Sequence, residues 1–291
     1  MLLLTLHLIA AYAEGAPIKI LMIGNSYTEG AKDELVHLLD VANIQYIFEA
    51  HNPGATTLTD HAGSQIVENL LNSMEWGVVV LQDQSVSPAN ASRYYGGSPS
   101  YESYYVVQGA INLAQKVYAA NPNTRIVWFS TPAYQTGNSY LNAYFNNDMS
   151  VMNGHTSYYY HYFRDNFSAA NSQVAETGEA FLLSYNTVPS RILHAGDKSH
   201  HSNTGQYLIA CVFFDTITKK SSEGLSDQSN VAPADRVELQ SIFKQVSQGK
   251  STDWGGDLWY YDSVSENLYP VNGLDLIVES VSWIPENPSP G

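Results

Sequence analysis

The sequence predicts an α/β fold in which a parallel sheet carries helices on both faces. Short apolar segments alternate with longer segments of helical spacing along most of the 291 residues, and this alternation is typical of a parallel sheet with crossover helices. Two of the short segments, Gly77–Leu81 and Arg125–Ser130, are built around uninterrupted apolar runs. Such runs are expected of strands that are buried on both faces.

Each element of this fold has its own signal in the sequence. The first predicted strand is an apolar, β-branched run that stops abruptly at Gly24, where a tight turn is expected. The helix after it places Leu35, Leu38 and Leu39 on one face. The remaining elements follow from similar patterns. Strands are predicted at 18–24, 45–50, 77–82, 125–130 and 180–183, and helices at 30–43, 62–73, 102–120, 148–174, 202–218 and 233–247.

The segment 85–101 is rich in Ser, Pro, Gly, Asn and Tyr and is predicted to be a long loop. It follows the carboxyl end of a predicted strand. Loops in that position commonly carry function, so we expect it to form a wall of the site.

Composition excludes two classes of partner. The net charge is −15, with 13 Lys and Arg against 28 Asp and Glu. Because the chain has no basic patch, it is not expected to bind nucleic acid or an anionic membrane surface. The single cysteine, Cys211, lies in an apolar run and is expected in the core, and one cysteine rules out an intrachain disulfide.

The amino-terminal residues predict secretion. Residues 1–13 form a short apolar run that ends in Ala11-Tyr12-Ala13, which has the form of a signal-peptide cleavage site. The run is too short to span a bilayer, and no insertion into a membrane is expected. The alternative is an ordinary buried segment.

Ser26 is the most informative residue, because it lies at a predicted strand–turn–helix junction. Ligands of open α/β sheets bind at the carboxyl ends of strands, and a helix start supplies free N–H groups and a positive dipole end. A nucleophilic hydroxyl is well placed there. The alternative is that Asn25 and Ser26 only cap the helix.

Three later motifs supply groups that such a nucleophile needs. Asn52–Leu58 contains Gly54, which lets the backbone approach a ligand closely. Leu81–Ser85 contains two glutamines, whose amides donate hydrogen bonds to an oxyanion without carrying charge. In Gly196–Ser202, Asp197 precedes His200 by three residues, so the carboxylate can bond the imidazole and stabilise its charged form.

Taken together, these four motifs resemble those of the SGNH hydrolases, also called the GDSL esterase/lipase superfamily. The resemblance covers residues 18 to about 219. It implies a three-layer α/β/α sandwich around a mostly parallel, flavodoxin-like sheet of five strands. It also implies Ser26 as the nucleophile, His200 and Asp197 as its triad partners, and the N–H groups of Ser26 and Gly54 with the Gln84 amide as the oxyanion hole.

The chain departs from the commonest pattern of that superfamily at two positions. Asn25 replaces an aspartate and Gln84 replaces an asparagine. Both departures are similar to a bacterial sub-branch that begins Gly-Asn-Ser-[Phe/Tyr]-Thr. Two assignments remain open from the sequence, since Gln82 is an alternative to Gln84, and His201 is a rival base to His200.

The resemblance implies a secreted serine esterase, and the tyrosine-rich, acidic sequence favours removal of O-acetyl groups from carbohydrate. The alternatives are a lipid or aryl esterase, and an idle SGNH-like domain that binds carbohydrate. The substrate would be a small ester or an acetylated polysaccharide. No cofactor or metal is expected, because the histidines lack ligand spacing and no phosphate-binding glycine loop is present.

The predicted domain organisation has four parts. A signal peptide at 1–13 precedes an SGNH hydrolase domain at 17–250, and an extension follows at 251–274. We expect the aromatic residues of the extension to pack on the main domain, with a sugar-stacking platform as the alternative. Residues 275–291 resemble the start of a cell-adhesion-related β-sandwich module, and the alternative is a lone edge strand.

Overall fold

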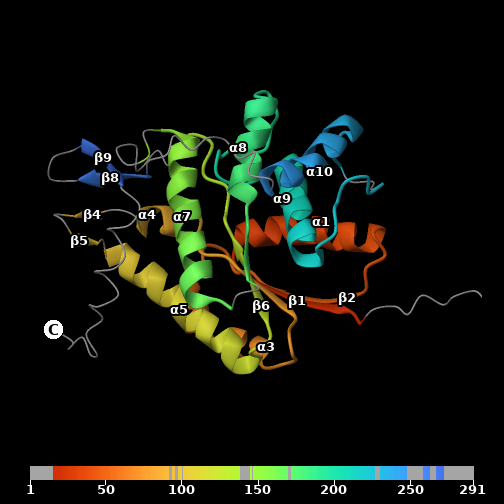
Figure 1. Ribbon diagram of the computed structural model, residues 1–291, viewed down its shortest axis with the longest axis horizontal. Helices are drawn as coiled ribbons and strands as arrows, with labels where there is room; N and C mark the ends of the chain where they lie inside the picture. Colours follow the sequence, from red (N-terminus) through yellow and green to blue (C-terminus); the bar gives the residue numbers. More distant parts are fainter. Residues whose placement is uncertain are drawn as a thin grey trace, which may run out of the picture.

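A five-stranded sheet forms the centre of the structure, a computed structural model (Figure 1). All four pairings in it are parallel, in the order β2-β1-β3-β6-β7. Its strands are β1 (Ile18–Ile23), β2 (Tyr46–His51), β3 (Val78–Leu81), β6 (Arg125–Phe129) and β7 (Gln173–Ala175). The structure describes residues 16–91, 94–95, 98–99, 101–137, 145, 147–169, 172–226, 230–247, 258–262 and 267–271.

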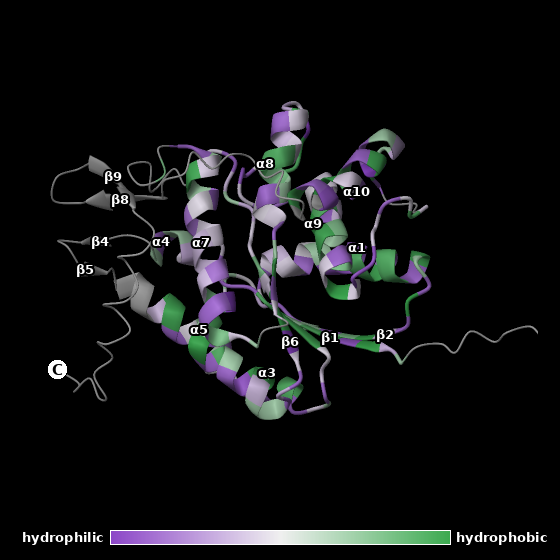
Figure 2. Cartoon of the chain, in the orientation of Figure 1, coloured by the Kyte–Doolittle hydropathy of each residue, from purple (hydrophilic) through white to green (hydrophobic). Residues whose placement is uncertain are grey.

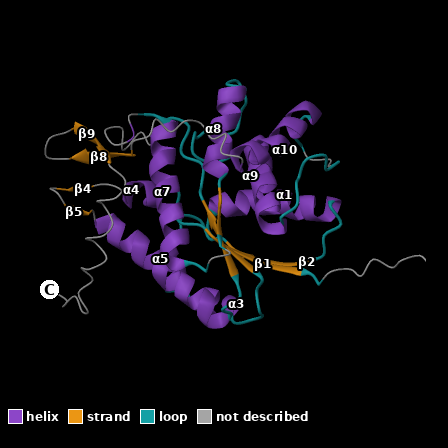
Figure 3. Cartoon of the chain, in the orientation of Figure 1, coloured by secondary structure: helices purple, strands orange, loops and turns teal. Residues whose placement is uncertain are grey.

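Helices cover both faces of this sheet and make a three-layer sandwich (Figure 3). One side carries α1 (Ser26–Val41), α8 (Thr177–Thr187), α9 (Asn203–Thr218) and α10 (Pro233–Ser247). The other side carries α2 (Leu58–Ala62), α3 (Gln65–Leu71), α5 (Tyr101–Ala120) and α7 (Met149–Phe167). The predicted α/β/α sandwich with five parallel strands is therefore confirmed.

The strands are apolar on both faces because two separate cores lie against them (Figure 2). Along β1, Ile20 and Met22 belong to the core beneath α1 and α9, whereas Leu21 and Ile23 belong to the core beneath α2 and α5. This alternation follows from the two-residue period of a strand.

The predicted strand at 180–183 is wrong, because these residues lie inside α8. A short apolar run does not distinguish a buried strand from a buried helix, and here the run continues as a helix. The fifth strand is instead β7, whose three residues are too few to show a period. The predicted helix 148–174 likewise ends at Phe167, before β7 begins.

Of the predicted helix 62–73, only Gln65–Leu71 forms a helix of its own, α3, because α2 ends at Ala62 and the chain turns at Gly63 and Ser64. The side chain of Ser64 caps α3 by accepting the N–H of Val67.

The predicted loop 85–101 contains regular structure. It begins with α4 (Ser87–Ala91) and continues into β4 (Tyr94–Tyr95) and β5 (Ser98–Pro99). These two short strands pair with each other, and β4 also pairs with β8 (Leu258–Asp262). Together with β9 (Asn267–Val271) they form a second, four-stranded sheet. Part of the predicted extension 251–274 therefore pairs through its backbone with the segment that was predicted to be a loop.

Two predicted segments, the signal peptide at 1–13 and the β-sandwich start at 275–291, lie outside the described residues. Within the described ranges, no helix has the length and apolar character that crossing a membrane requires.

The order of the strands in the sheet determines where a ligand site is expected. The chain passes from β1 to β2 on one side and then crosses to β3 on the other. The carboxyl ends of β1 and β3 therefore flank the point where the winding reverses, which is where open α/β sheets bind ligands. Ser26 follows β1, and Gln82 follows β3.

Candidate active site

Ser26 is the first residue of α1, and the turn before it is fixed by buried hydrogen bonds. Asn25 caps α1 by accepting the N–H of Tyr27 at 3.2 Å, so the predicted capping role applies to Asn25. The Oε1 of Gln82 accepts the N–H of Asn25 at 2.8 Å and the hydroxyl of Thr28 at 2.9 Å. The hydroxyl of Ser26 takes no part in the cap and faces His200.

Gly24 is required in this turn because of its close neighbours. A Cβ atom at Gly24 would lie 2.2 Å from Oγ1 of Thr28 and 2.6 Å from Oε1 of Gln82. Both atoms belong to the hydrogen bonds that hold the turn, so a larger residue would displace them.

Ser26, His200 and Asp197 form a hydrogen-bonded array. Ser26 Oγ lies 3.0 Å from His200 Nε2, and His200 Nδ1 lies 2.6 Å from Asp197 Oδ2. The other oxygen of Asp197 accepts the N–H groups of Ser199 and His200 at 3.0 and 2.9 Å. The structure thus brings together the three residues that the sequence singled out, in the arrangement by which a base activates a hydroxyl.

Electrostatics favour the charged form of Asp197. Burial opposes its ionisation, but the hydrogen bonds from the His200 ring and from two backbone N–H groups outweigh that effect and lower the pKa of the carboxyl. The side chains of His200 and Asp197 are each 49% exposed. The array therefore lies at an open surface that a bulky molecule can reach.

His201, the rival base, makes no hydrogen bond to Ser26. Its side chain is buried, and its ring packs edge-on against Tyr27 at 4.5 Å and near Phe181 at 5.5 Å. Burial lowers the pKa of His201 well below its ordinary value. Of the two adjacent histidines, the structure places only His200 within hydrogen-bonding distance of Ser26.

The loop that contains Gly54 is tied to the turn before Ser26. The side chain of Asn25 donates to the carbonyl of Thr56 at 3.0 Å, and Thr56 Oγ1 donates to the carbonyl of Gly24 at 3.1 Å. His61, a residue of α2, is buried and donates to the same Gly24 carbonyl at 2.9 Å. The second motif is thereby held beside the first.

Two backbone N–H groups near Ser26 have no acceptor among the described residues. The N–H of Ser26 belongs to the first helical turn, whose donors have no partner within the helix. The N–H of Gly54 likewise makes no hydrogen bond in the described part of the chain, and Gly54 is exposed. Both are the donors that the family resemblance implies for an oxyanion hole.

The two glutamines after β3 have different roles. Gln82 is fully buried, and its amide is used up, since it accepts from Asn25 and Thr28 and donates to the carbonyl of Asp83. Gln84 is half-buried, and its Oε1 caps the start of α4 by accepting the N–H of Val86 at 2.8 Å and that of Ser87, the first residue of α4, at 3.2 Å. Among the described residues, its Nε2 makes only a long contact of 3.4 Å with Ser85 Oγ, so this N–H donor is available to a ligand.

Sequence reasoning did not identify three further side chains near the array. Tyr27 is buried and donates its hydroxyl to the carbonyl of Ser199 at 2.7 Å. Ser85 and Tyr134 share a hydrogen bond of 3.2 Å. Ser85 and Tyr27 stood inside motifs that the sequence marked, but Tyr134 carried no signal of its own.

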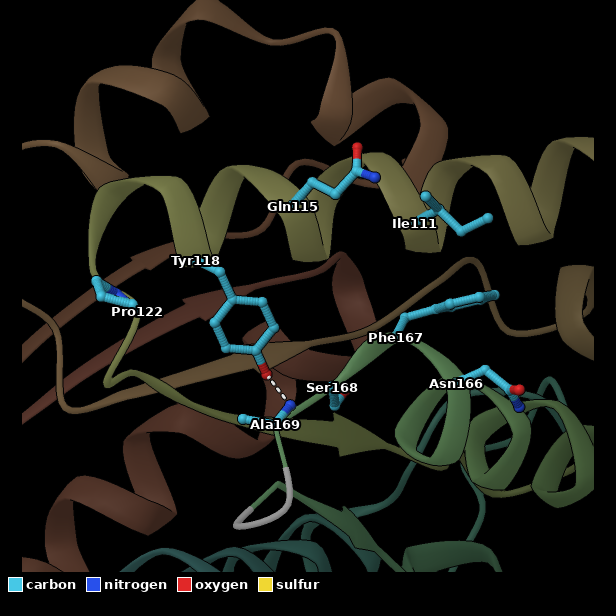
Figure 4. A pocket seen from close by; sticks show the side chains of 8 residues that line it. All are labelled: Ile111, Gln115, Tyr118, Pro122, Asn166, Phe167, Ser168 and Ala169. Atoms are coloured by element: carbon cyan, nitrogen blue, oxygen red, sulfur yellow. Dashed lines mark hydrogen bonds between the residues drawn. The ribbon is translucent and has the colours of Figure 1, made fainter.

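Two other features of the described residues are separate from this array. No group of three or more His, Cys, Asp or Glu side chains in the described ranges is arranged to hold a metal ion. An open groove lies between the later parts of α5 and α7 (Figure 4), where Tyr118 and Phe167 line it and the hydroxyl of Tyr118 accepts the N–H of Ala169 at 2.7 Å. It lies towards the start of β6, at the opposite ends of the strands from Ser26.

Comparison with known proteins supports the fold. No protein-family model matches the sequence, and a search of curated proteins found no match. Among solved structures, a DUF4886 family protein from Bacteroides uniformis superposes with a TM-score of 0.66 at 15% identity, over 81% of this chain and 97% of that one. A protein described as a GDSL-like lipase from Parabacteroides merdae gives 0.53 at 15% identity, over 69% and 96%. The SGNH-hydrolase fold expected from the sequence is therefore confirmed.

Proposed function

We propose that this chain is a secreted serine esterase that removes O-acetyl groups from carbohydrate. The observation that carries the proposal is the continuous hydrogen-bonded array of Ser26, His200 and Asp197 at the start of α1. Such an array, beside unused N–H donors, suits the transfer of an acyl group from an ester to a hydroxyl. The SGNH-hydrolase fold agrees with this reaction class.

The reaction has two steps, the acylation of Ser26 and the hydrolysis of the acyl-enzyme. His200 Nε2 takes the proton of Ser26 Oγ as this oxygen attacks the ester carbonyl carbon, and the same proton then passes to the leaving alcohol as its C–O bond breaks. Water repeats the sequence on the acyl-enzyme, so that Ser26 recovers its proton and a carboxylic acid leaves. The N–H groups of Ser26 and Gly54 and the Gln84 amide stabilise the oxyanion in both steps.

Carbohydrate is the substrate class that the site favours. The side chains of His200 and Asp197 are half exposed, so a bulky polymer can bring a small acyl group to Ser26. The net charge of −15 disfavours an anionic lipid surface, which supports carbohydrate over lipid.

The proposal is tested by hydrolysis of the acetate, butyrate and octanoate esters of p-nitrophenol, with the wild type and Ser26→Ala. We expect acetate-selective activity that Ser26→Ala reduces by at least about 10³-fold. Preference for the longer chains would replace the carbohydrate proposal with a lipid or aryl esterase. Activity that survives Ser26→Ala would overturn the mechanism.

A fluorophosphonate probe, which reacts with activated serines, separates an enzyme from an idle binding domain. We expect the wild type to be labelled and Ser26→Ala not to be labelled. A wild-type protein that stays unlabelled and inactive would favour the binding domain.

A further inference from the structure

Asp83 is a fully buried carboxyl group that lies between two parts of the candidate oxyanion hole. It follows β3 directly, and its residue is 1% exposed. Its Oδ1 accepts two backbone N–H groups, from Leu58 at 3.1 Å and from Gln84 at 2.7 Å. Its Oδ2 is buried and has no hydrogen-bond partner among the described residues.

The two N–H groups held by this oxygen belong to the segments that carry the candidate oxyanion donors. Leu58 is the first residue of α2 and follows Gly54 by four positions, so it ends the loop that presents the Gly54 N–H. Gln84 carries the candidate side-chain donor itself. One carboxyl oxygen thus joins the Gly54 loop to the end of β3.

We propose that Asp83 is a positioning residue of the active site, whose Oδ1 holds the Gly54 loop and the Gln84 backbone in place for oxyanion stabilisation. The inference rests on the proposed esterase function. Asp83 does not touch the reacting atoms, and it acts through the N–H groups that it orders. Preorganised donors are effective only when their positions are fixed before the reaction.

The surroundings of Asp83 favour its uncharged form. The titratable groups that face it are Asp60 on α2 and Tyr160 on α7, and neither supplies a positive charge. The hydroxyl of Tyr160 accepts the N–H of Asp83 at 3.0 Å. Burial, with a smaller contribution from Asp60, raises the pKa of Asp83 to about 7.

This protonation state matters for the reaction. A neutral carboxyl keeps Oδ1 as an acceptor and places no negative charge behind a developing oxyanion. Ionisation of Asp83 would add such a charge, which opposes the oxyanion. This added charge predicts that wild-type turnover suffers, relative to an uncharged variant, as pH rises through about 7.

Two substitutions separate the role of the acceptor from that of the charge. Asp83→Asn keeps an oxygen at the position of Oδ1 and cannot ionise, whereas Asp83→Leu has a similar shape and no acceptor. We expect Asp83→Leu to lower kcat for p-nitrophenyl acetate by about 10²-fold, the effect of misplacing an oxyanion donor. We expect Asp83→Asn to stay within about threefold of the wild type at pH 6, because it restores the acceptor.

Asp215 provides the matched control. It is also buried, its Oδ1 accepts the N–H of Ser222 at 2.7 Å, and burial raises its pKa to about 6. It lies near the carboxyl end of α9, whereas His200 lies just before the start of that helix. Asp215→Asn and Asp215→Leu are expected to shift the melting temperature without changing kcat.

The decisive measurement is the ratio of the Asp83→Asn rate to the wild-type rate from pH 5 to pH 9. All other groups are common to the two proteins, so the ratio isolates Asp83, and we expect it to rise through about pH 7. A flat ratio, or equal losses in the Asn and Leu variants, would contradict the proposal. If Asp83→Leu does not fold, the pH dependence of the ratio of the Asp83→Asn rate to the wild-type rate still tests the proposal.

Ser26→Ala shows which proposal has failed. If Ser26→Ala remains active, the esterase mechanism itself is wrong. If Ser26→Ala is inactive but Asp83→Leu turns over as fast as the wild type, only the positioning role of Asp83 is wrong.

Discussion

Tyr27 donates its hydroxyl to the carbonyl oxygen of Ser199 across 2.7 Å. Tyr27 follows Ser26 in the chain, and Ser199 precedes His200, so this one bond joins the helix of the hydroxyl to the loop of the base. The ring of Tyr27 also lies 5.3 Å from the ring of His200. The distance between Ser26 and His200 therefore depends on Tyr27 as well as on their own contact.

Tyr27→Phe should slow turnover while leaving the fold intact. The variant keeps the ring and loses the bond to Ser199, a contact of about 1 kcal/mol, so kcat is expected to fall about five- to tenfold. The measurement is kcat on p-nitrophenyl acetate. Tyr46→Phe is the control. Tyr46 is the first residue of β2, and its hydroxyl donates a hydrogen bond to Asp40 away from the site. Equal rates for all three proteins would refute the role of the Tyr27 hydroxyl.

Replacing each of the adjacent histidines should separate chemistry from packing. His200→Ala removes the group within reach of Ser26 Oγ and is expected to abolish turnover and fluorophosphonate labelling. His201→Ala leaves a cavity beside Tyr27 and is expected to lower the melting temperature, with labelling retained. Loss of labelling in His201→Ala alone would reverse the assignment.

Gln84→Glu should remove the oxyanion donor without removing the cap of α4. Glutamate keeps an oxygen that accepts the N–H of Val86, but it loses the amide N–H and adds a negative charge. We expect kcat to fall by about 10²–10³ with little change in melting temperature. Gln84→Ala should show a similar fall in kcat and should also lower the free energy of unfolding by about 1 kcal/mol. A wild-type rate in either variant would exclude Gln84 from the oxyanion hole.

His194 should make the protein less stable in mild acid. It is buried, and burial lowers its pKa to about 4, against about 6.5 for an unfolded chain. The unfolded state therefore binds more protons between pH 6.5 and 4, and the free energy of unfolding falls as pH falls through that window, by on the order of 3 kcal/mol. Both ring nitrogens are used, with Tyr185 and with the carbonyl of Ala133, each at 2.9 Å.

Denaturant unfolding at pH 7, 5.5 and 4.5 checks this prediction. His194→Gln cannot titrate and is expected to lose less stability than the wild type between these pH values. Parallel pH curves for the two proteins would show that His194 does not contribute.

The sequence predicted those parts of the fold in which local pattern and tertiary structure agree. The runs of β1, β3 and β6 are mostly apolar and contain β-branched residues, as expected of buried parallel strands. Prediction of strands from the hydrophobic pattern failed at Ala180–Leu183, where four apolar residues belong to a buried helix. It also failed at β7, which is too short to show a period.

The candidate site could be predicted to the level of residue identity but not of contacts. Ser26, Asp197 and His200 stand in local motifs, and the spacing of the last two already allows their hydrogen bond. The support from Gln82 to Asn25 and from Tyr27 to Ser199 joins residues far apart in the sequence, and only the sheet order brings them together. For the same reason, sequence alone predicted Gln84 as the donor but left Gln82 open as an alternative.

The hydrogen bonds that fix the turn before Ser26 do not involve the Ser26 hydroxyl. Gln82, Thr56 and His61 all bond the backbone of Gly24 or Asn25. Ser26→Ala should therefore keep the shape of the wild-type surface while being unable to turn over what binds there. Immobilised Ser26→Ala would then serve as a capture reagent that retains the natural ester intact, so that mass spectrometry of the eluted material can identify it.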